Sequence, residues 1–159
     1  METTYGSIQA KNIGGISLKN LLIISCSKTK NHLNDVPAID LYDGQAYRVI
    51  KKRTPKDIEI LIISAKYGLL RSTDVISYYD EVMTVSRALA MRKEVSEAIS
   101  EFVFGEEFQE IHKIFIYLGF PYNLTISNEL MSYLPEYFNL QIASGPIGKR
   151  LHQLKEVIQ

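Results

Sequence analysis

LLIISCSKTK, residues 21–30, begins as an apolar run and ends in hydroxyl, thiol and amine side chains. IEILIISAKYGL, residues 58–69, repeats this arrangement. A short continuous run of Leu and Ile is typical of a strand buried on both faces, as in a parallel sheet covered by helices. Ligands of open α/β sheets bind outside the carboxyl ends of the strands. The two stretches therefore predict both an α/β fold and the place of its functional site.

The rest of the chain continues the alternation of strands and helices. Two further strands are expected at 114–118 and 138–142, and four helices at 44–53, 84–105, 124–133 and 147–158. We expect a loop at 66–70 and a short helical turn at 108–112. The pattern predicts a three-layer α/β domain over residues 21–159, with a mostly parallel sheet of four or five strands and helices on both faces. Residues 1–20 are polar and contain Gly14-Gly15, which predicts a loose lead-in.

The composition is that of a globular protein, with 23% charged and 46% hydrophobic residues among 159. Lys plus Arg and Asp plus Glu number 18 each, so no overall positive field attracts nucleic acid. The region from Lys28 to Lys56 is locally basic, and only three aspartates oppose its cations, which are Lys28, Lys30, Arg48, Lys51, Lys52, Arg53 and Lys56. A solvated helix face and a basic flank beside an anionic ligand both fit this excess.

A single cysteine excludes an intrachain disulfide and suits a reducing cytoplasm. The first residues lack the pattern of a signal peptide, and no apolar run approaches a membrane span. We therefore expect a cytoplasmic protein without membrane contact. One Cys and three scattered His lack the spacing of zinc ligands, so we expect no metal and no other cofactor.

The loop after the first strand carries candidate reactive groups. Lys28 and Lys30 would favour the thiolate of Cys26, which is the nucleophilic form. A lone cysteine at a strand end is also a common buried core residue. The hydroxyls of Ser25 and Ser27 beside an ammonium suit a phosphate or a carboxylate. A polar loop that caps the next element explains the same residues, so these alternatives stay open.

The second strand runs into a comparable loop. Lys66 must reach solvent or find a partner, and a lysine held there with a lowered pKa acts as a base or nucleophile. Gly68 allows a positive φ or a close approach of the backbone. An ordinary turn with an exposed lysine is the alternative.

Aromatic and acidic side chains accompany these loops. Tyr42, Tyr67 and Tyr79 fit positions at the edge of the core, and each ring offers a face for stacking on a base. Asp80 is the carboxylate that we place in the site, with an ordinary loop aspartate as the alternative.

Two glycines mark the ends of the later strands. Gly119 follows the third strand, and Gly145 precedes the last helix. Free N–H groups at that helix start would bind an anion, with Lys149 and Arg150 reinforcing the charge. The spacing matches neither the P-loop nor the dinucleotide fingerprint.

Four motifs, in order, resemble a bacterial family of small uncharacterised α/β proteins labelled peroxide-stress YaaA-like; they are residues 24–30, 41–44, 63–69 and 78–80. The resemblance covers about residues 21–158 and implies a link to DNA or to iron-linked oxidative damage. Cys26 and Lys30 are also similar to part of a motif in archaeosine synthase, which acts on a deazaguanine base in tRNA. That motif continues with Pro-Tyr-Ser, whereas Asn31-His32-Leu33 follows here. Related domains imply a uracil-DNA-glycosylase-like fold.

We therefore expect an enzyme that handles a nucleobase or nucleotide, by base or nucleoside modification or by glycosidic chemistry. The expected catalytic residues are Cys26, Lys30, Lys66 and Asp80. The expected ligand-binding residues are Ser25, Ser27, Lys28, Tyr42, Tyr67, Gly68, Tyr79, Gly119, Gly145 and Lys149. One alternative is a non-catalytic DNA- or RNA-binding or oxidative-stress-response module, and another is a protein that binds a small molecule or a partner. The oligomeric state stays open.

Overall fold

The computed structural model describes residues 12–13, 16–105 and 111–159. Its centre is a five-stranded sheet in the order β6-β5-β3-β8-β9. The strands are β3 (Lys19–Ser25), β5 (Ile58–Ser64), β6 (Gly68–Arg71), β8 (Ile111–Tyr117) and β9 (Asn139–Ile142). Neighbouring strands pair in parallel except for β6, which runs antiparallel to β5 at one edge.

The apolar run at 21–24 forms the middle of the sheet. β3 pairs with β5 on one side and with β8 on the other, so its backbone groups find partners within the sheet. Leu21, Leu22, Ile23 and Ile24 are buried. Burial on both faces explains why the run shows no alternation of apolar and polar residues.

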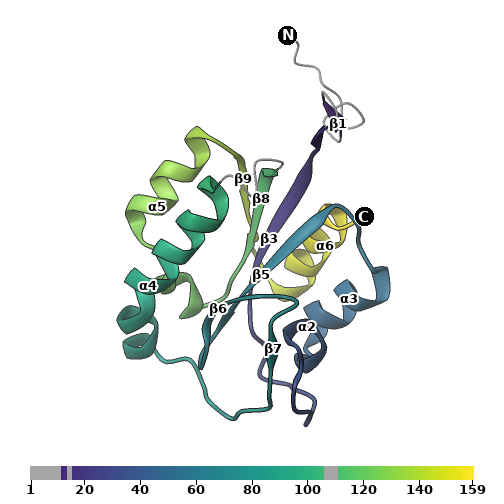
Figure 1. Cartoon of the computed structure of the whole chain (residues 1–159), viewed down its shortest axis with the longest axis vertical. Coiled ribbons are helices and arrows are strands. Elements are labelled where there is room, and N and C mark those ends of the chain that lie inside the picture. The colour runs from purple at the N-terminus through teal and green to yellow at the C-terminus, as the bar shows by residue number, and fades with distance from the viewer. Residues whose placement is uncertain (1–11, 14–15, 106–110) are drawn as a thin grey trace.

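Helices cover both faces of the sheet (Figure 1). α3 (Gln45–Arg53) and α6 (Ile147–Val157) lie on one face. α4 (Val85–Phe104) and α5 (Asn128–Tyr133) lie on the other. Thr84 caps α4 by accepting a hydrogen bond from the backbone N–H of Arg87, and Ser127 caps α5 in the same way.

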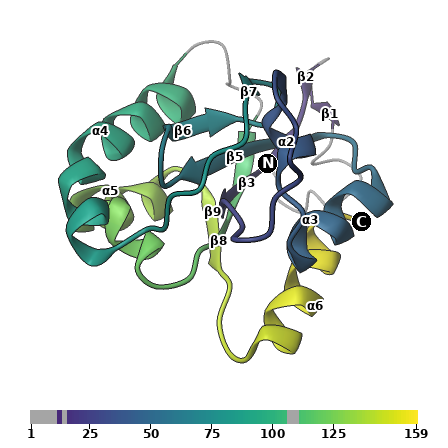
Figure 2. The same ribbon diagram turned by 90° about the horizontal axis from the view of Figure 1, so that it is seen from below.

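Short elements fill the connections at the carboxyl ends of the strands, which face the viewer in Figure 2. β4 (Val36–Pro37) pairs antiparallel with β7 (Val75–Ile76), and α2 (Ala38–Leu41) follows β4. These elements tie the β3–α3 connection to the β6–α4 connection. Two 3₁₀ turns, η2 (Tyr122–Thr125) and η3 (Leu134–Glu136), flank α5. β1 (Asn12–Ile13) and β2 (Ile16–Ser17) form a separate two-stranded ladder.

The α/β class, the four parallel strands and helices on both faces are confirmed. The loop expected at 66–70 is wrong, because Gly68 at φ 77° opens strand β6 and pairs with Ser64. The helix expected from 124 begins at Asn128, because residues 122–125 form η2 and Ser127 caps α5.

Two other expectations fall partly on residues that the structure does not describe, and for their remaining residues the structure differs from the expectation. In the helical turn expected at 108–112, Ile111 and His112 belong to strand β8, and residues 108–110 lie outside the described residues. Of the lead-in expected at 1–20, residues 1–11 and 14–15 also lie outside them, while β3 already begins at Lys19. None of the described helices is long and apolar enough to cross a membrane.

Candidate functional site

Cys26 lies at the carboxyl end of β3, in the middle of the sheet. Its backbone N–H donates to the carbonyl of Ile63 at 2.9 Å, which extends the pairing of β3 with β5 by one residue. The thiol lies 3.0 Å from the hydroxyl of Tyr122, and Cys26 is 7% exposed. Tyr122 opens η2 after β8, so this contact joins the loops that follow two neighbouring strands.

A chain of hydroxyls surrounds the thiol. The Tyr79 hydroxyl lies 2.9 Å from Ser64 Oγ and 2.7 Å from the Tyr42 hydroxyl. Ser64 Oγ also accepts from the backbone N–H groups of Lys66 and Tyr67, at 3.1 and 3.0 Å. We call Cys26, Tyr42, Ser64, Tyr79 and Tyr122 the Cys26 cluster.

The hydrogen bonds of Ser64 determine which group receives its hydroxyl proton. A hydroxyl has two acceptor positions and one proton, and both acceptor positions of Ser64 are taken by backbone N–H groups. Ser64 therefore donates its proton to Tyr79. The Tyr79 proton is then directed to Tyr42 or to the nearby Cys26 thiol. Within this part of the cluster the donated proton therefore runs from Ser64 to Tyr79.

Burial keeps the tyrosines of the cluster neutral. It raises the pKa of Tyr42 to about 12, because a phenolate there would lose its hydration. Burial, followed by the adjacent Cys26 thiol, raises the pKa values of Tyr79 and Tyr122 further. Tyr47, whose hydroxyl donates to the Ser25 carbonyl at 2.8 Å, also has a pKa raised by burial. These hydroxyls therefore act as hydrogen-bond donors at neutral pH.

Of the two lysines expected to be catalytic, Lys30 lies against the cluster. Its ammonium is 4.7 Å from the centre of the Tyr79 ring, and its backbone bridges to Tyr42. Lys66 is exposed, and its ammonium lies 5.2 Å from the ring of the adjacent Tyr67. The Arg87 side chain donates to the carbonyls of Ala65 and Lys66 and holds this turn. Lys30 therefore borders the cluster, whereas Lys66 lies on the exposed turn beside it.

Tyr67 is the stacking candidate with an accessible ring. It is 37% exposed and meets Tyr79 edge-on at 5.4 Å between ring centres. Tyr42 and Tyr79 are buried, so their hydroxyls rather than their ring faces point to a role. Asp80 is exposed and has no hydrogen bond or ion pair with another described residue. The structure therefore places Tyr67 at the rim and does not bring Asp80 into the cluster.

The loop serines have structural partners. Ser27 Oγ donates to the Thr29 carbonyl at 2.6 Å and accepts from the Gly44 N–H at 3.3 Å. A Cβ at Gly44 would lie 2.8 Å from the Ser27 Cβ, so the start of α3 needs glycine at this approach. The Ser25 carbonyl holds Tyr47, and Lys28 is exposed. These contacts favour the interpretation of a loop that organises the next helix.

Arg150 from α6 reaches the end of β8. Its guanidinium donates to the Leu118 carbonyl at 3.0 Å and lies 4.8 Å from the centre of the Tyr117 ring. A Cβ at Gly119 would lie 4.0 Å from Arg150 Nη1, which is an ordinary contact, so this approach does not require glycine. Tyr117 Oη and Arg150 Nε are buried without a hydrogen-bond partner among the described residues. Unpaired buried polar atoms are rare in folded proteins, so this pair sets the β8 end apart from the rest of the site.

The start of α6, where we expected an anion site, differs from that expectation. Gly145 has φ 92°, and the Lys149 stem lies over it, since a Cβ at Gly145 would meet Lys149 Cδ at 2.8 Å. Lys149 is exposed, whereas Arg150 is partly buried beside β8. Of these neighbouring cations, Arg150 is therefore the one that the fold directs to the sheet.

The sequence analysis did not assign Tyr122 and Ser64 of the cluster to the site, and it did not single out Tyr47 or Arg150. Tyr122 follows the third strand as Cys26 follows the first, and this position after a strand end was the available signal. Ser64 was the last residue of a strand, and Tyr47 looked like an apolar helix position. The sequence places Arg150 next to Lys149, but it does not show which of the two side chains lies against the sheet.

Comparisons with known proteins identify the family of the chain. No curated protein and no solved structure matches the chain. A family model matches residues 21–156, a range that includes the Cys26 cluster, Arg150, four strands of the sheet and β3 from Leu21 on. The chain therefore belongs to DUF6884, a family of unknown function.

Proposed function

We propose that this protein is an enzyme that handles a nucleobase or nucleotide at the carboxyl ends of its parallel strands. The observation that carries the proposal is the Cys26 cluster, in which a buried thiol lies 3.0 Å from one phenol within a network of hydroxyls. Binding sites of open α/β sheets lie at this edge. Cys26 is the candidate reacting group, as nucleophile or in proton transfer.

The surroundings of the thiol suit a flat, polar ring. Neutral phenols donate hydrogen bonds to the oxygens and nitrogens of a base, and burial holds Tyr42 and Tyr79 in that form. The ring of Tyr67 at the rim offers a stacking face. These features support a nucleobase as the recognised group.

The charged groups suit an anionic substituent on that ring. Arg150 Nε is a buried donor without a partner among the described residues, and Tyr117 Oη beside it is in the same state. A guanidinium binds phosphate strongly. Lys30 adds a second positive charge at the Tyr79 side of the cluster. Lys66 and Asp80 are assigned to the rim.

The proposal requires a reduced thiol. It therefore assigns the protein to a reducing compartment such as the cytoplasm.

A thermal-shift screen with nucleobases, nucleosides and nucleotides tests the proposal. A ligand at one hundred times its Kd stabilises by about 2.7 kcal/mol, which shifts Tm by several degrees in a domain of this size. We expect Arg150→Ala to abolish the shift from nucleotides but keep that from nucleosides, and Lys30→Ala to reduce both. Lys93→Ala on α4 is the matched control and should leave both shifts unchanged. If no compound of these classes stabilises the protein, the proposal is wrong.

A further inference from the structure

A groove between α3 and α6 is lined almost entirely by cations. It has a volume of about 400 Å³ and is bordered by Arg48, Val49, Lys52, Arg53 and Lys155. The first four residues come from α3 and Lys155 comes from α6. Among the described residues, no acidic side chain lines this groove.

The cations of the groove are largely without internal counter-charge. Arg48 is paired with Asp43, with 3.2 Å between Nη2 and Oδ2. No ion pair joins Lys52, Arg53 or Lys155 to another residue within the described ranges. Arg48 and Lys52 are also four residues apart on one helix, where like charges repel. A bound anion would relieve this repulsion.

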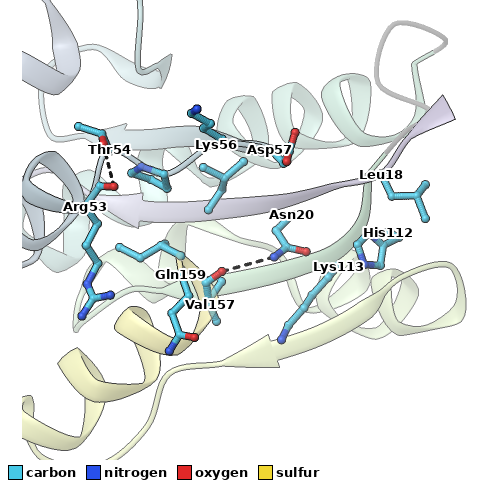
Figure 3. A pocket seen from close by; sticks show the side chains of 13 residues that line it. Leu18, Asn20, Arg53, Thr54, Lys56, Asp57, His112, Lys113, Val157 and Gln159 are labelled. Carbon is cyan, nitrogen blue, oxygen red and sulfur yellow. Dashed lines mark hydrogen bonds between the residues drawn. The ribbon is translucent and has the colours of Figure 1, made fainter. Parts of the chain in front are cut away.

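The basic surface continues into a second hollow at the amino ends of the strands (Figure 3). This hollow has a volume of about 570 Å³ and shares Arg53 with the groove. Lys56 and Lys113 add cations, and Asp57 is the acidic side chain in its lining. In Figure 3 the side chain of Lys56 extends upward, whereas those of Arg53 and Lys113 extend downward at separate places of the lining. Separated charges of this kind suit an extended polyanion better than one small anion.

The other face of the sheet has the opposite character. A groove of about 840 Å³ between α4 and α5 is lined by Glu97, Glu101 and Glu129, with Lys93 as the cation. The formal net charge of the chain is 0, so the two faces differ in charge although the whole is neutral. Such a separation steers a polyanion toward the α3–α6 face.

We propose that the α3–α6 groove and the adjoining hollow form one track for the sugar–phosphate backbone of a single-stranded nucleic acid. Arg48, at the head of the track, is paired with Asp43, which directly follows Tyr42 of the Cys26 cluster. A strand on the track therefore passes beside the site. This inference rests on the proposed function and narrows its substrate to a base within a polynucleotide. The strand is single because a base must be unpaired to enter a buried site.

Fluorescence anisotropy with a labelled single-stranded 12-nucleotide DNA or RNA, over a series of salt concentrations, tests the track. Each neutralised phosphate contributes about 0.7 to the slope of log K against log salt concentration. We expect Lys52→Glu/Lys155→Glu to lower this slope by about 1.4 and to weaken binding at low salt by at least about tenfold. Lys52→Glu alone is compared with Lys93→Glu, an equal change of charge on an exposed lysine of α4. The first should weaken binding and the second should not.

Three results would overturn the track. They are equal effects of Lys52→Glu and Lys93→Glu, tighter binding of a duplex than of the single strand, and absence of salt-dependent binding. Failure of the track and failure of the proposed function give different results. If nucleotides stabilise the protein through Arg150 but oligonucleotides do not bind, the site takes free nucleotides and only the track is wrong. If oligonucleotides bind through Lys52 and Lys155 but no nucleobase compound shifts Tm, the track stands and the enzyme assignment fails.

Discussion

Polar residues are buried at the carboxyl end of the parallel sheet and exposed at its amino end. At the carboxyl end, Ser64, Tyr42 and Tyr79 are buried and bonded to one another. At the amino end, Arg53 and Lys56 are exposed around an open hollow. The difference follows from the connections, since β4, β7 and α2 fold over the carboxyl end, whereas only residues 54–57 separate α3 from β5. The covered carboxyl end therefore holds its side chains in defined positions, whereas the open amino end presents charged side chains to solvent.

The largest effect that tests this comparison is expected from Tyr79→Phe. The change removes the central hydroxyl of the cluster and leaves the buried hydroxyls of Ser64 and Tyr42 without that partner. We expect a loss of about 2–3 kcal/mol in the free energy of unfolding, measured by urea denaturation. Tyr67→Phe is the control, because its hydroxyl is exposed and makes a 3.4 Å contact, so it should change little. Equal effects of the two changes would contradict the network.

Gly44→Ala should give the next largest effect. Its Cβ would lie 2.8 Å from the Ser27 Cβ, so the loop after β3 and the start of α3 must separate. We expect a loss of about 1–3 kcal/mol in the free energy of unfolding. Gly148→Ala on α6 is the control, because no atom lies within 4 Å of the added Cβ. The carboxyl end is packed less tightly than described if Gly44→Ala is as stable as the control.

The pH dependence of stability should reveal the buried tyrosines. The pKa of Tyr42 is raised from 10.0 to about 12, so the folded state retains a proton that the unfolded chain loses above pH 10. Stability from this residue is therefore complete below pH 10 and is lost as pH rises from 10 toward 12, at about 1.4 kcal/mol per pH unit. Denaturant unfolding between pH 8 and 11 measures this fall. The fall should be shallower in Tyr42→Phe, and identical slopes would place Tyr42 in contact with solvent.

The smallest change in stability is expected at the amino end. Lys52→Glu, in the α3–α6 groove that adjoins the amino-end hollow, replaces a cation that has no ion pair with another described residue, so the free energy of unfolding should change by no more than about 0.5 kcal/mol. Thermal denaturation at low and high salt measures this. A large loss of stability would mean that Lys52 has a structural partner and would remove the contrast between the two ends.

The sheet was predictable because buried parallel strands are encoded in short local runs. β3 and β5 were expected within two residues of their observed starts, and their carboxyl ends located Cys26 and Ser64. β6 was missed because its geometry depends on the positive φ of Gly68, which the sequence allowed but did not require. Local runs therefore predict strands better than they predict turns.

The cluster was only partly predictable because its contacts join distant segments. Cys26 and Tyr122 are separated by 96 positions, and no local pattern predicts their contact. Tyr79 and Asp80 were expected together, yet Tyr79 is buried and Asp80 is exposed. Neighbouring side chains of an extended segment point to opposite sides, so a sequence motif cannot tell which of the two enters a site.

The contact between Cys26 and Tyr122 also gives the protein a natural probe of local opening around the thiol. The chain contains one cysteine, and its thiol is almost fully covered. We expect a thiol-specific dye to react with Cys26 when local opening uncovers the thiol, and the labelling rate then measures that opening. A ligand that binds at the Cys26 cluster should lower the labelling rate, so binding can be followed in the natural sequence without an engineered probe.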